Sequence, residues 1–103
     1  MSFINIYSYL IEGSNILGTT MRVTIVVSVD TLTTATITIE DSSNIEKVTN
    51  ATMTRETTGI YTYSYSSDID DLDGTYIARV TLVSGTDTTI EELAFNMVDQ
   101  SDQ

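Results

Sequence analysis

The chain contains no cysteine, no histidine, no proline and no tryptophan, and only 4 of its 103 residues are Lys or Arg. Without cysteine it forms no disulfide. Without cysteine and histidine it lacks the usual ligands of zinc and other transition metals. The same absences exclude catalytic triads built on Ser-His or Cys-His pairs. No glycine-rich phosphate-binding loop is present. The sequence therefore predicts a protein that is not an enzyme.

Positive charge is also scarce. The chain has 15 acidic residues and 4 basic ones, which gives a formal net charge of −11. Nucleic-acid binding depends on Lys and Arg that neutralise phosphates, and an anionic membrane surface repels an acidic protein. No apolar run approaches the roughly 18 residues that span a membrane. The first basic residue is Arg22, so the N-terminus lacks the basic region of a secretory signal. We expect neither nucleic acid nor membrane as a partner, and no export signal.

Alternation of apolar and polar side chains is the main positive signal. Successive side chains of a strand point to opposite faces, so a period of two predicts half-buried strands. No apolar stripe with helical spacing is present. Residues 45–57 alternate weakly and predict one or two short edge strands. Ile90 is out of phase with Leu93 and Phe95, which predicts a bulge at Glu91 and Glu92. The predicted strands cover residues 3–11, 21–29, 34–40, 45–57, 59–67, 75–84 and 87–98.

Three motifs carry a resemblance to a known family: Thr58-Gly59-Ile60-Tyr61-Thr62-Tyr63, Leu72-Asp73-Gly74-Thr75-Tyr76 and Ala78-Arg79-Val80-Thr81. Residues 21–98 resemble the immunoglobulin-like modules common in tailed-phage virions and bacterial surface proteins, although the prolines frequent in those modules are missing. The resemblance implies an all-β fold, an immunoglobulin-like antiparallel β-sandwich of about seven strands. Residues 1–98 would form this single domain, with 1–20 as an N-terminal strand or arm and 99–103 as a flexible tail. Tyr76 would be the structural tyrosine corner of the sandwich.

The resemblance also implies a role. It indicates a non-enzymatic structural or assembly protein, a component of a tailed-phage particle such as a capsid-decoration or tail protein, located in the virion. The expected partners are other structural subunits, including copies of the chain itself in a homo-oligomer. The alternative is an adhesin module, extracellular or at a cell surface, that binds surface glycans. Tyr61, Tyr63 and Tyr65 share one strand face, where they either fill the core or offer rings to sugars.

The N-terminal segment has more apolar side chains than one edge strand is expected to hide. Such a segment can pair with another subunit by strand addition. The alternative is that the domain itself covers both of its faces. The residues predicted for an assembly interface are Phe3, Ile4, Ile6, Tyr7, Tyr9 and Leu10.

One acidic cluster precedes Gly74. Asp68, Asp70, Asp71 and Asp73 place four carboxylates within six residues, which suits a hard cation such as calcium. Residue 69 is isoleucine, so this is not an EF-hand loop. The alternative is an acidic, solvated loop between strands. No other cofactor is predicted.

Overall fold

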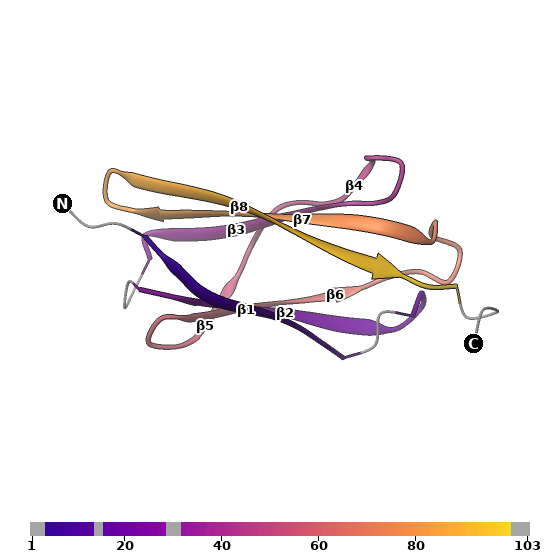
Figure 1. Cartoon of the computed structure of the whole chain (residues 1–103), viewed down its shortest axis with the longest axis horizontal. Helices are drawn as coiled ribbons and strands as arrows, with labels where there is room; N and C mark the ends of the chain where they lie inside the picture. The colour runs from indigo at the N-terminus through magenta and orange to yellow at the C-terminus, as the bar shows by residue number, and fades with distance from the viewer. Residues whose placement is uncertain (1–3, 14–15, 29–31, 100–103) are drawn as a thin grey trace.

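The computed structural model describes residues 4–13, 16–28 and 32–99. Over these ranges the protein has no helix, and therefore none long and apolar enough to cross a membrane. Eight strands form two antiparallel sheets that face each other (Figure 1). The first sheet has the order β1 (Ile6–Gly13), β2 (Thr20–Val27), β6 (Ile60–Ser66), β5 (Thr54–Thr57). The second has the order β4 (Glu46–Thr52), β3 (Thr34–Glu40), β7 (Gly74–Ser84), β8 (Asp87–Met97).

The strand order confirms the predicted fold class. If the strands are lettered A, B, C, C′, D, E, F and G along the chain, the sheets read A-B-E-D and C′-C-F-G, which is the order of immunoglobulin-like sandwiches. There are eight strands rather than seven because residues 45–57 form β4 in one sheet and β5 in the other. The chain changes sheets at Met53, which is buried and donates its N–H to the Ala35 carbonyl at 2.8 Å.

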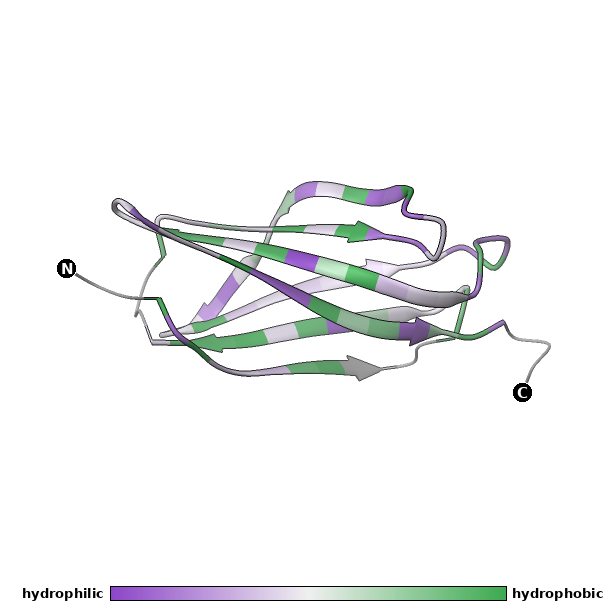
Figure 2. Ribbon diagram, turned by 45° about the horizontal axis from the view of Figure 1, so that its top comes forward, coloured by the Kyte–Doolittle hydropathy of each residue, from purple (hydrophilic) through white to green (hydrophobic). Residues whose placement is uncertain are grey.

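The core lies between the sheets and is built mainly by the inward residues of β2, β3, β6, β7 and β8. Figure 2 shows the resulting change between hydrophobic and hydrophilic residues along the strands. Each fully buried aliphatic or aromatic side chain contributes about 1.5–3 kcal/mol to the free energy of unfolding. The inward apolar side chains are therefore the main source of stability. The largest fully buried side chains are Leu17, Met21, Val23, Ile25, Ile37, Ile39, Tyr76, Val80, Leu82, Leu93 and Met97.

The last hairpin is more regular than the sequence predicts. β7 and β8 pair without a register shift from Gly74 and Met97 to Ser84 and Asp87. The predicted bulge at Glu91 and Glu92 is therefore wrong. The period of two is intact, and Ile90 is simply an exposed apolar residue on the outer face, which is common in soluble proteins. As a consequence Glu91, opposite the buried Val80, lies on the inner side of its strand.

Two predictions fall wholly or largely outside the described residues. Phe3, the first predicted interface residue, is not among them. Of the predicted tail 99–103, only Asp99 is described.

Candidate functional site

β1 is an edge strand, paired with β2 on one side only. Its register shifts between Ile6 and Ser8 and then runs unbroken from Ser8, opposite Val26, to Gly13, opposite Met21. An edge strand directs backbone N–H and C=O groups away from its sheet, where they can pair with another strand. From Ser8 onward, β1 is thus a regular template for such pairing.

The structure divides the predicted interface residues into two groups. Tyr7, Tyr9 and Leu10 are exposed, at 70%, 56% and 55% of their surface. Ile4 is buried and Ile6 packs against the core, so these two side chains are not free to contact a partner. The exposed apolar side chains of the predicted interface therefore lie in β1 after Ile6.

A groove separates β1 from β8. It has a volume of about 450 Å³ and is lined by residues 4–9 on one side and by Thr89 and Glu91 on the other. The Thr89 hydroxyl donates to the Ile4 carbonyl at 3.3 Å and so links the two walls. Tyr9 pairs with the buried Ile25 and thus lies on the inner side of β1, which directs it toward this groove.

The other three sheet edges carry features that hinder strand addition. β5 has only four residues. β4 has Glu46 and Lys47 and two register shifts against β3. β8 has Glu91 and Glu92. Charged side chains, irregular pairing and short length all protect sheet edges. β1 has one register shift, after Ile6, and one charged residue, Glu12. Between them, Ser8–Ile11 is an uncharged stretch in regular register that is open to strand addition.

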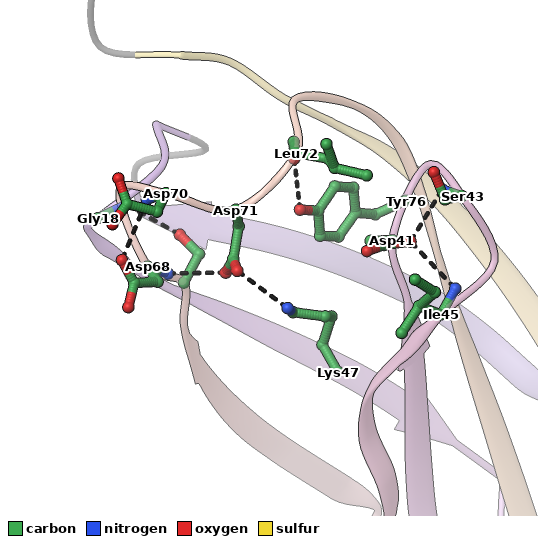
Figure 3. A network of polar contacts seen from close by, with 11 residues as sticks. Gly18, Asp41, Ser43, Ile45, Lys47, Asp68, Asp70, Asp71, Leu72 and Tyr76 are labelled. Carbon is green, nitrogen blue, oxygen red and sulfur yellow. Dashed lines mark hydrogen bonds and ion pairs between the residues drawn. The ribbon is translucent and has the colours of Figure 1, made fainter.

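The predicted calcium loop lies between β6 and β7 (Figure 3). Its carboxylates bind their own loop: the Asp68 N–H donates to Asp71 Oδ2 at 2.8 Å, and the Asp70 N–H donates to Asp68 Oδ1 at 3.0 Å. In the part of the chain that the structure describes, no group of three or more carboxylates is arranged to hold a metal ion. The geometry gives no support to calcium binding at Asp68, Asp70, Asp71 and Asp73, which stays a prediction.

Lys47 connects this loop to the edge strand β4. Its Nζ lies 2.9 Å from Asp71 Oδ1. Burial alone would raise the pKa of Asp71, but the hydrogen bond with Asp68 and the ion pair with Lys47 together lower it. The hydrogen bond and charge of Asp71 raise the pKa of Lys47. Both groups therefore stay charged at neutral pH, and the pair fixes the loop.

Tyr76 lies fully buried beneath the same loop. Its hydroxyl donates to the Leu72 carbonyl, and its ring contacts Phe95 with 5.7 Å between ring centroids. Burial, with a smaller effect of the nearby Asp71 and Asp41, raises the pKa of Tyr76 to about 12. Tyr76 therefore acts as a structural hydrogen-bond donor that closes this end of the sandwich.

Two acidic residues with clear places in the structure, Asp41 and Glu91, are not among the predicted site residues. Asp41 is buried and accepts the N–H groups of Ser43 and Ile45 at 2.8 and 3.0 Å, which organises the turn between β3 and β4 (Figure 3). In the sequence, this turn is indicated by the Asp, Ser and Asn residues at 41–44, which are residue types common in turns. The predicted bulge obscures the orientation of Glu91, whereas an unbroken period of two places it on the inner side of β8.

The tyrosines of β6 belong mainly to the core. Tyr61 and Tyr65 are buried, and Tyr63 packs against the core cluster. The Tyr61 hydroxyl also accepts the Leu32 N–H at 2.7 Å. Tyr61 and Tyr65 therefore do not offer open ring faces to a sugar.

Sequence comparisons add no family to this description. No protein-family model matches the chain, and no curated protein matches it. The function is therefore best argued from the fold and from the exposed edge strand.

Proposed function

We propose that the protein is a non-enzymatic assembly module that binds a partner subunit by adding a strand to β1. The observation that carries this proposal is the unprotected edge at Ser8–Ile11, flanked by the exposed Tyr7 and including the exposed Tyr9 and Leu10. In strand addition, main-chain hydrogen bonds supply affinity and alternate side chains supply specificity. β1 offers both the unpaired main-chain groups and the exposed side chains that this binding mode needs.

The particle that we propose is a tailed-phage virion, with this chain as a capsid-decoration or tail component. Three features support it: the sandwich topology, the resemblance of residues 21–98 to virion modules, and an edge available for assembly. The adhesin alternative is less well supported, because Tyr61 and Tyr65 fill the core instead of forming a sugar-binding surface.

Leu10→Lys tests the proposal, with Ile90→Lys as its matched control. Both residues are exposed apolar side chains of edge strands, at 55% and 58% of their surface. A lysine on an edge opposes pairing with another strand. Substitutions at such exposed sites change stability by about 0.5 kcal/mol or less. We expect wild type and Ile90→Lys to enter purified virions in stoichiometric amounts and Leu10→Lys to be lost from them.

Quantitative mass spectrometry of particles purified from infected cells measures this incorporation, and circular dichroism confirms that each variant is folded. Equal incorporation of Leu10→Lys and wild type would show that β1 is not the assembly edge. Absence of the wild-type chain from all particles would exclude the virion role.

A further inference from the structure

Glu91 is the charged residue that lines the groove between β1 and β8. It is exposed, and among the described residues its carboxylate has neither an ion pair nor a hydrogen bond. Its neighbour Glu92 differs, because it points to the outer face and pairs with Arg79 Nη2 at 3.0 Å. One carboxylate in the groove is therefore unneutralised, next to apolar and aromatic side chains.

No Lys or Arg lines the groove to balance this charge. Lys47 is already paired with Asp71, and Arg79 with Glu40 and Glu92. The chain as a whole has a net charge of −11. An occupant that brings a positive charge to Glu91 would complement the groove, whereas an acidic occupant would be repelled.

We propose that the occupant is an extended segment of a different protein, with small apolar side chains and one Lys or Arg placed against Glu91. This inference rests on the proposed function and names the partner's chemistry. A strand added to β1 alternates its side chains, so every second one would point toward the groove. Tyr9 would contact the apolar side chains there, and Glu91 would bind the cation.

A second copy of the chain does not fit this description. Pairing between two β1 strands would bring together segments without any basic residue, because the first Lys or Arg of the chain is Arg22. Neither copy would neutralise the Glu91 of the other. Two molecules of charge −11 would also repel each other. Charge complementarity thus selects a basic partner over self-association.

The test uses three short capped peptides of alternating valine and threonine that differ only at the central residue, which is lysine, glutamine or glutamate. Each is titrated into the isotope-labelled full chain, and binding is followed by the amide signals of β1 and β8. We expect all shifts to map to these two strands and affinity to decrease from lysine to glutamine to glutamate. Added salt should reduce the preference for lysine.

Two variants separate the local charge from the net charge. Glu91→Gln should weaken binding of the lysine peptide by about two- to fivefold, the range of an exposed ion pair, and leave the glutamine peptide unchanged. Glu92→Gln removes the same charge from the outer face of the same strand and should preserve the order of the peptides. Loss of the preference in both variants alike would overturn the assignment to Glu91.

Equal binding of the three peptides at β1 would overturn the basic partner and leave strand addition intact. Failure of every peptide to shift β1 signals would overturn the groove as a strand-binding site, while the virion experiment with Leu10→Lys decides the proposed function independently. Sedimentation of the chain alone tests whether a second copy is the occupant. A dimer abolished by Leu10→Lys would make a second copy the occupant, which overturns this inference and retains assembly through β1.

Discussion

Two buried tyrosines at one end of the sandwich differ in a single hydrogen bond. The Tyr76 hydroxyl donates to the Leu72 carbonyl. Tyr65 is 5% exposed, and its hydroxyl has no partner among the described residues. A buried polar group without a partner costs about 1–3 kcal/mol, whereas a satisfied hydrogen bond contributes about 1 kcal/mol. Chemically identical hydroxyl groups thus have opposite effects on stability here.

Phenylalanine substitutions test this difference directly. Tyr76→Phe should lower the free energy of unfolding by about 1–2 kcal/mol, because the Leu72 carbonyl loses its donor. Tyr65→Phe should leave the free energy of unfolding unchanged or raise it by up to about 1 kcal/mol, because an unsatisfied hydroxyl is removed. Urea denaturation of both variants measures the two changes in the free energy of unfolding. A larger loss for Tyr65→Phe than for Tyr76→Phe would mean that the Tyr65 hydroxyl has a stabilising partner.

At the scale of the element, β7 begins where the chain passes very close to another turn. Gly74 has a φ of 115°, a conformation that favours glycine, and a Cβ added there would lie 2.9 Å from Ser42 Cβ. Ser42 Oγ also donates to the Asp73 carbonyl at 2.7 Å. The start of β7 is therefore packed directly against the β3–β4 turn.

Gly74→Ala should destabilise the protein more than Gly85→Ala does. Gly85 also has a positive φ, of 62°, but no atom lies within 4 Å of its added Cβ. Gly85→Ala strains the backbone by about 1 kcal/mol, because its φ lies in the left-handed α region. Gly74 lies outside that region, so Gly74→Ala strains the backbone more, and its contact with Ser42 adds about 1–2 kcal/mol. Thermal unfolding of the two variants measures the difference. Equal melting temperatures of the two variants would show that the β3–β4 turn moves away from the added methyl group at no cost.

The sequence predicts elements well where one face of a strand is buried along its whole length. β2, β3 and β7 follow directly from alternation because every second residue packs in the core. The separation of β4 from β5 does not, since it depends on Met53 entering the core from a segment with weak periodicity. A weak local pattern is decided by tertiary packing.

The candidate site was partly predictable for a related reason. Apolar composition marked the N-terminal strand, but it could not tell the buried Ile4 from the exposed Tyr7, Tyr9 and Leu10. That distinction depends on the register shift after Ile6 and on the groove between β1 and β8. The acidic loop was equally visible in the sequence, whereas the ion pair of Asp71 with Lys47 requires the position of β4.

For the whole molecule, two buried tyrosine hydroxyls make the stability sensitive to high pH. Burial raises the pKa of Tyr65 and, to about 12, that of Tyr76, from an ordinary value of 10.0. Both phenols stay neutral in the folded state at pH values where they ionise in the unfolded state. The stability that comes from keeping these phenols neutral is fully present below pH 10.0. It is lost as the pH rises through the folded-state pKa.

We therefore expect the free energy of unfolding to decrease from pH 10.0 toward pH 12, with Tyr76 accounting for a loss on the order of 2 kcal/mol. Tyr65→Phe should make this decrease shallower, because one of the two groups no longer titrates. Urea denaturation at a series of alkaline pH values measures the slope, and tyrosinate absorbance follows the ionisation. A slope that Tyr65→Phe does not change would mean that Tyr65 ionises equally in both states.

The placement of the first and last strands has a mechanical consequence. β1 begins at one end of the long axis of the molecule, which measures 49 Å, and β8 ends at the other (Figure 1). Tension applied through these two strands acts along their length, so β1 would have to slide along β2, and β8 along β7. All the hydrogen bonds of each pair then bear the force together instead of opening one after another. Such a fold resists stretching along its long axis.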